Sequence, residues 1–183
     1  MGWENYHLHE FQIAGKAYGE PDPEDHHFGR DVLDERRTSV GKLLGAGSSF
    51  AYLYDFGDNW RHDILLESVS PATPRKRYPV CVAGERSAPP EDVGGTGGYE
   101  RYLAALFDPK HKDHRAVLAW RGRFNPSYFS PTRANQNLRE AFPLRPRQVH
   151  KPSSPAATFE GGFDLLVRSV IRSGRLPKQK RLH

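Results

Sequence analysis

The feature that most constrains this chain is the stretch at residues 50–67, FAYLYDFGDNWRHDILLE. Large side chains recur at every second position in both of its halves: Phe50, Tyr52, Tyr54 and Phe56, then Trp60, His62, Ile64 and Leu66. A period of two is typical of half-buried strands. The stretch therefore predicts a β-hairpin.

The length of the hairpin loop decides which residues face each other. A three-residue loop at residues 57–59 pairs Phe56 with Trp60 and Tyr54 with His62. It places the large rings on one face, where cross-strand pairs stabilise a sheet. A two-residue loop would turn the apolar side chains of the second strand to the other face. The three-residue register also predicts an ion pair between Asp55 and Arg61 across the strands.

Composition predicts one soluble domain followed by a tail. The chain has 183 residues, a single cysteine (Cys81) and no apolar run near the roughly 20 residues that span a bilayer. One cysteine excludes an internal disulfide and a cysteine-rich zinc module. The first residues lack the basic start and apolar run of a signal peptide. We therefore expect a cytoplasmic protein without a membrane segment.

The basic charge of the chain lies in its tail. Residues 141–183 hold nine of the 27 Lys and Arg but only two of the 22 acidic residues, so the first 140 residues have a net charge of −2. We predict a domain at residues 1–142 and, at 143–183, a basic linker rich in Pro and Arg followed by an amphipathic helix. Its apolar stripe is Phe163, Leu166, Val167, Val170 and Ile171. That helix either docks on the core or binds a partner or nucleic acid. The candidate nucleic-acid-binding residues are Arg168, Arg172, Arg175, Lys178, Lys180 and Arg181.

Periodicity and capping residues predict the other elements. Strands are expected at residues 7–14 and 78–84, and helices from Thr38 or Ser39 to about residue 44, at 98–107, at about 111–120 and from Pro131. In the helix at 98–107, the predicted core stripe is Tyr99, Tyr102, Leu103, Leu106 and Phe107.

Two groups of polar residues are candidates for chemistry. Asp55, Asp58 and His62 belong to the hairpin, where they are either structural or serve as metal ligands or acid–base groups. Asp55 and His62 point to opposite faces of a regular strand, which argues against a shared metal ion. Glu91 and Asp92 either hold their loop through backbone N–H groups or act as a catalytic or metal-binding pair.

The candidate functional cluster combines both groups with one aromatic residue: Asp55, Asp58, Trp60, His62, Glu91 and Asp92. Whether the hairpin and the Glu91–Asp92 loop meet in space is open at this stage. We assign no catalytic residue, no metal site and no cofactor from the sequence.

Three ordered blocks carry a resemblance to a known family. They are YLYDFGDNWRHDILLE, YPVCVAGERSAPPEDVGGTGGYERYLAAL and DPKHKDHRAVLAWRGRFNPSYFS. With the YDFGDxWxH and PPEDxGGxxGY patterns, residues 3–141 resemble the plasmid pRiA4b ORF-three-like family, also described as a passenger TnpR-like family of mobile elements. The resemblance implies a compact α+β roll with a mainly antiparallel sheet, built here around the 50–67 hairpin and packed against a few short helices. It implies a plasmid or mobile-element setting but no established reaction.

The family pattern usually begins with a further strand and helix, including a Pro-x-x-W-R-like segment. This sequence starts at the block that follows them, so we expect an N-terminal truncation relative to the family. A missing strand would leave a sheet edge or an apolar face uncovered.

Three functions are compatible with these features. The favoured one is a non-catalytic binding module for nucleic acid or for a protein of a mobile element, because aromatic faces stack bases and the tail is basic. The alternative is a metal-dependent or acid–base enzyme that uses the carboxylates of the hairpin tip and of the PPED loop. The third is a structural adaptor.

Overall fold

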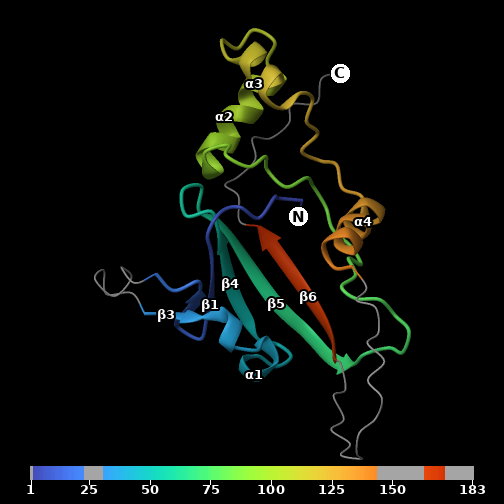
Figure 1. Cartoon of the computed structure of the whole chain (residues 1–183). Coiled ribbons are helices and arrows are strands. Elements are labelled where there is room, and N and C mark those ends of the chain that lie inside the picture. Colours follow the sequence, from blue (N-terminus) through green and yellow to red (C-terminus); the bar gives the residue numbers. More distant parts are fainter. Residues whose placement is uncertain (1, 23–30, 144–162, 172–183) are drawn as a thin grey trace, which may run out of the picture. The chain divides into compact units, whose positions relative to one another are not determined.

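The described residues of the computed structural model, 2–22, 31–143 and 163–171, form an α+β fold, as predicted. The sheet has the strand order β3-β2-β1-β4-β5-β6, with antiparallel pairs β1–β2, β1–β4 and β4–β5 and a parallel pair β2–β3 (Figure 1). The strands are β1 (His9–Ile13), β2 (Lys16–Gly19), β3 (Val32–Asp34), β4 (Ser49–Tyr54), β5 (Trp60–Pro71) and β6 (Phe163–Ile171). The helices are η2 (Glu35–Arg37), α1 (Val40–Leu43), α2 (Gly95–Phe107), α3 (His114–Arg121) and α4 (Pro131–Ala141). None of the helices within the described ranges is long and apolar enough to cross a membrane.

The hairpin forms, but its predicted register is wrong by two residues. Tyr54 faces Trp60 and Tyr52 faces His62, so the turn runs from Asp55 to Asn59. Asp55 leaves the strand with a left-handed backbone (φ 59°), and its Oδ1 accepts hydrogen bonds from the N–H groups of Gly57 and Asp58 at 2.9 and 3.2 Å. Asp tolerates this backbone conformation, and its side chain commonly accepts hydrogen bonds from the backbone of the turn that follows. A shift of two residues keeps the large rings on one face, which is why the predicted faces are right.

The predicted ion pair between Asp55 and Arg61 is also wrong, because Arg61 faces Leu53. The Arg61 guanidinium instead bonds Asp63 at 3.2 Å and the Gln12 side chain at 3.3 Å. Asp55 is thereby left to contact a different part of the chain.

The aromatic face of the hairpin packs against α2. Tyr54 and Trp60 form one buried cluster with four residues of that helix, namely Tyr99, Tyr102, Leu103 and Leu106. These four confirm most of the predicted stripe, but Phe107 is 58% exposed and lies outside the core. The Trp3 ring stacks on Tyr54 with ring centres 4.9 Å apart and planes 12° apart. The N-terminal segment therefore covers the end of the face that α2 leaves open.

Residues 70–88 and 125–143 belong to a second compact unit, which contains α4. Ser130 caps α4 by accepting a hydrogen bond from the N–H of Arg133, and Arg77 donates to the carbonyls of Arg139 and Phe142 at its other end. The predicted strand at 78–84 does not form. The Asn135 side chain bonds both the N–H and the C=O of Cys81 at 2.8 Å, which takes the groups that a neighbouring strand would need.

The predicted helix in the tail is wrong, because residues 163–171 form β6 beside β5. In so short a segment, the apolar residues fit the period of a strand as well as that of a helix. Val167, Val170 and Ile171 are β-branched, which favours a strand. The twelve-residue β5 also offers backbone groups at its edge that another strand can pair. The predicted linker and the candidates Arg172, Arg175, Lys178, Lys180 and Arg181 lie outside the described residues, and the side chain of Arg168 is not described.

Candidate metal centre

The N-terminal segment at residues 3–7 lies between the hairpin and the loop at residues 89–92. The indole N–H of Trp3 donates to the Pro89 carbonyl at 2.8 Å. The backbone N–H of Glu4 donates to Glu91 at 2.9 Å, and the Tyr6 hydroxyl donates to Asp92 Oδ2 at 2.6 Å. Three segments that are far apart in sequence therefore meet at the hairpin tip (Figure 1).

His7, Asp55 and Asp92 converge at this meeting point. His7 Nε2 lies 3.1 Å from Asp92 Oδ1 and 3.5 Å from Asp55 Oδ2. One ligand atom from each residue lies within 4.8 Å of the other two, as the shared coordination of one metal ion requires. Each residue comes from a different segment, so the tertiary fold alone creates the cluster.

Asp55 is the buried member of the cluster, with a side chain only 10% exposed. Its Oδ1 is occupied by the turn N–H groups, and its Oδ2 faces His7. A carboxylate this deep needs a positive partner, because burial without one is costly. A cation bound at Oδ2 would supply that charge.

Asp92 is the exposed member, with a side chain 56% accessible. Its Oδ2 accepts the Tyr6 hydroxyl, and that hydrogen bond lowers the pKa of Asp92 and raises the pKa of Tyr6. Its Oδ1 is left toward His7. Like Asp55, Asp92 has a left-handed backbone (φ 58°), so a tight bend in the loop turns its carboxylate toward the hairpin.

The other two carboxylates of the predicted cluster serve the fold. Asp58 Oδ2 accepts a hydrogen bond from the Gly94 N–H at 3.1 Å, where it complements the positive end of α2. Glu91 is buried and accepts from the Tyr54 hydroxyl and the Glu4 N–H. Burial and the bond to Glu91 raise the pKa of Tyr54 to about 12.

Trp60 and His62 belong to the core rather than to the metal cluster. Both are essentially inaccessible, and the His62 ring lies 5.5 Å from Trp3 in an edge contact. His62 Nδ1 is 3.1 Å from the Tyr52 carbonyl, and burial lowers the pKa of His62. These two residues are thus placed to pack the aromatic face.

The hairpin tip and the PPED loop therefore meet, and Asp55 and Asp92 of the predicted cluster come together. His7 and Tyr6 were missed by the sequence analysis. His7 precedes β1. The sequence pattern that could have indicated it is the spacing of two histidines, His7 and His9, at alternate positions. That pattern also describes ordinary strand residues: His9 itself pairs with Glu35 at 3.1 Å.

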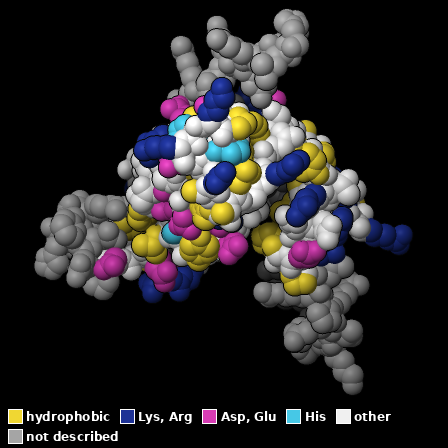
Figure 2. All heavy atoms as spheres, turned by 90° about the horizontal axis from the view of Figure 1, so that it is seen from above, with side chains coloured by type: hydrophobic (Ala, Val, Ile, Leu, Met, Phe, Trp, Pro, Cys, Tyr) yellow, Lys and Arg dark blue, Asp and Glu magenta, His cyan; other side chains and the backbone are white. Residues whose placement is uncertain are grey.

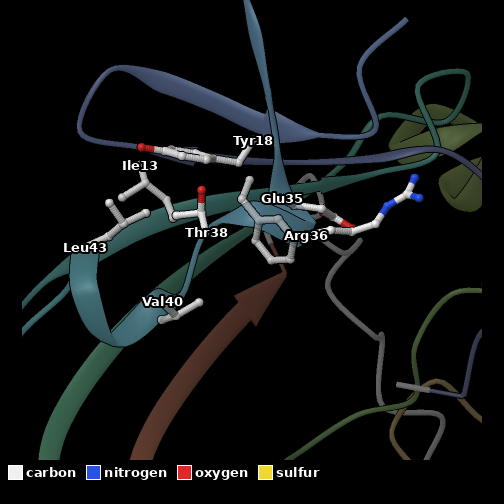
Figure 3. Close-up of a pocket in the computed structure, with 8 residues that line it drawn as sticks. Ile13, Tyr18, Glu35, Arg36, Thr38, Val40 and Leu43 are labelled. Atoms are coloured by element: carbon white, nitrogen blue, oxygen red, sulfur yellow. The ribbon is translucent and has the colours of Figure 1, made fainter.

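A separate hollow of about 200 Å³ lies between the strands β1 and β2 and the elements η2 and α1 (Figure 3). It is mostly apolar and is smaller than a typical ligand pocket, which measures about 300–1,000 Å³. The lining comes from β1, β2, η2 and α1 and comprises Phe11, Ile13, Tyr18, Glu35, Arg36, Thr38, Val40 and Leu43.

The comparisons with known proteins assign the family. A model of the plasmid pRiA4b ORF-3-like protein family matches residues 1–133. The chain belongs to this family. The uncharacterized protein y4hQ of Sinorhizobium fredii is 42% identical over 124 residues, which are 67% of this chain and 62% of that protein. The chain thus spans less than two thirds of the length of this relative.

A solved structure is also similar to this chain of the pRiA4b ORF-3-like family. It is the crystal structure of MM3350, a protein of unknown function from Methanosarcina mazei Go1. The TM-score is 0.63 at 35% identity, and the match covers 73% of this chain and 75% of that chain. The family model and the y4hQ relative confirm the predicted family, and neither y4hQ nor MM3350 is described with a reaction or a ligand.

Proposed function

We propose that this protein is a binding module that holds one divalent transition-metal ion between His7, Asp55 and Asp92. The observation that carries the proposal is the approach of one ligand atom from each residue to within 4.8 Å of the others. One imidazole and two carboxylates form a mixed donor set, which suits Zn²⁺ or Mn²⁺ better than Mg²⁺.

The hydrogen bonds around the cluster support metal binding. In each carboxylate, one oxygen is fixed by a neighbouring donor: Asp55 by the turn N–H groups and Asp92 by Tyr6. The other oxygen of each faces His7 Nε2. Metal-ligating carboxylates are commonly oriented by such outer donors. The two aspartates are therefore held in the arrangement that a shared ion needs.

A site with three protein ligands leaves coordination positions for water or for a ligand. The exposure of Asp92 puts those positions within reach of solvent. This openness favours a second candidate function, a metal-dependent enzyme in which a bound water reacts. We propose that the partner of this module is nucleic acid or a protein of a mobile element. We also propose that the protein acts in the cytoplasm, in a plasmid or mobile-element setting.

Thermal unfolding of EDTA-treated protein in increasing Zn²⁺, Mn²⁺ and Mg²⁺ tests the metal site. An ion that binds only the folded state raises stability by about 2.7 kcal/mol at 100 times its Kd. We expect Zn²⁺ and Mn²⁺ to raise Tm to a larger extent than Mg²⁺. His7→Gln and Asp92→Asn should lose most of that increase, since each removes one ligand at an accessible position.

His111→Gln and Asp113→Asn are the matched controls. These two residues contact each other at 3.8 Å in the turn before α3, away from the cluster. They should keep the full metal-dependent rise in Tm. The metal site is refuted if Tm responds to none of the ions, or if His7→Gln and Asp92→Asn respond as strongly as the controls.

A further inference from the structure

The turn before α3, α3 itself and the residues after it carry a concentrated positive charge. Residues 110–123 contain five Lys and Arg but a single acidic residue, Asp113. All five basic side chains are exposed: Lys110, Lys112, Arg115, Arg121 and Arg123. Figure 2 looks onto this end of the molecule and shows Lys, Arg and His side chains spread over it. This local charge contrasts with the slightly acidic balance of the first 140 residues.

The orientation of α3 separates a packed side from an exposed side. Val117 and Leu118 pack on the core cluster, and Arg121 donates to the Glu91 carbonyl at 3.3 Å. Arg115, Ala116 and Ala119 are exposed, and they lie on the opposite side of an ideal helix. Within the described residues, no ion pair is found for Lys112, Arg115 or Arg123. Their charges are therefore available to an anion.

Trp120 lies in the last turn of α3 and is 46% exposed. Its ring makes an edge contact with Tyr102 at 5.8 Å, and the Arg121 guanidinium lies 5.0 Å from its centre. These contacts hold the indole while leaving almost half of it accessible. An accessible ring among cations suits base stacking, which complements backbone contacts in proteins that bind single strands.

We propose that α3 and the residues directly before and after it bind single-stranded nucleic acid. Lys112, Arg115 and Arg123 contact phosphates, and Trp120 stacks on a base. The small side chains of Ala116 and Ala119 let the strand approach the helix. The proposal needs no metal ion and does not rest on the site at His7.

Fluorescence anisotropy of labelled oligothymidine and oligouridine, each of about 12 nucleotides, tests the proposal with the full chain. The measurements are made in EDTA over a series of salt concentrations, so that a failure of the metal proposal does not affect them. Trp120→Ala should weaken binding by about 5- to 100-fold at an unchanged salt slope, since the stacking contact is lost. Combined Lys112→Ala, Arg115→Ala and Arg123→Ala should weaken binding and reduce the salt slope by about 0.7 for each contact removed, the value for single strands.

The matched control removes equal charge at exposed positions of other elements, by Lys16→Ala in β2, Lys42→Ala in α1 and Arg133→Ala in α4. It should retain most of the affinity. Circular dichroism establishes that each variant is folded, and the triple variant at Lys112, Arg115 and Arg123 tests the proposal independently if Trp120→Ala unfolds. Binding that is absent, that the control variant weakens as strongly, or that polyglutamate competes for as well as unlabelled oligonucleotide would overturn the proposal.

Discussion

Replacement of Gly98 by alanine tests how tightly α2 packs on the loop that carries Asp92. A Cβ atom at Gly98 would lie 1.9 Å from the Val93 carbonyl oxygen and 2.7 Å from its carbon. Both are backbone atoms, so no side-chain rotation can relieve the clash. Overpacking of this kind costs about 1–3 kcal/mol or more. Alanine is a better helix former than glycine, which offsets about 1 kcal/mol of this cost. The net expectation is a loss of up to about 2 kcal/mol in the free energy of unfolding.

Gly97→Ala is the matched control, one residue away in the same helix. Its Cβ would have as its nearest neighbour the tip of the Arg101 side chain, at 3.5 Å, which is an ordinary contact. This substitution should therefore stabilise the protein by up to about 1 kcal/mol. Urea denaturation followed by circular dichroism gives both free energies, with equal m values as the test of comparable unfolding. A Gly98→Ala protein as stable as the Gly97→Ala protein would refute the close packing.

Two further predictions concern the N-terminal segment and the buried tyrosine. Trp3→Ala should destabilise the protein by about 2–4 kcal/mol in the same urea assay. The substitution removes ring contacts with Tyr54, Trp60 and His62 and the hydrogen bond to the Pro89 carbonyl. A loss below about 1 kcal/mol would show that this segment does not cover the aromatic face. The pKa of Tyr54 is raised from 10.0 to about 12, so the folded state favours the neutral phenol. Its contribution to stability is complete below pH 10 and is lost as the pH rises toward 12, so stability measured across that range should fall less steeply in Tyr54→Phe than in the unchanged protein. Equal slopes would contradict this assignment.

Local patterns in the sequence were enough to predict the hairpin faces and most helices. The alternation around Tyr54 and Trp60 fixes the buried face whatever the loop length, provided that the shift is even. Ser130 and Pro131 mark the start of α4, where the Ser130 side chain caps the helix. These signals act within a few residues, and the structure confirms them.

The features that the sequence could not predict depend on contacts between distant segments. The left-handed backbone of Asp55 lengthens the turn and frees one carboxylate oxygen for His7. The assignment of β6 depends on the open edge of β5, which no pattern within residues 163–171 reveals. The metal cluster likewise joins His7, Asp55 and Asp92 only after the N-terminal segment lies between the hairpin and the loop at 89–92.

X-ray absorption at the zinc edge, on protein loaded with one equivalent of Zn²⁺, tests the metal centre most directly. The account predicts a first shell of nitrogen and oxygen at about 2.0–2.2 Å, with outer scattering from one imidazole. That imidazole scattering should disappear in His7→Gln and persist in His111→Gln. A sulfur ligand, scattering from two or more imidazoles, or an identical spectrum for His7→Gln would contradict a centre made by His7, Asp55 and Asp92.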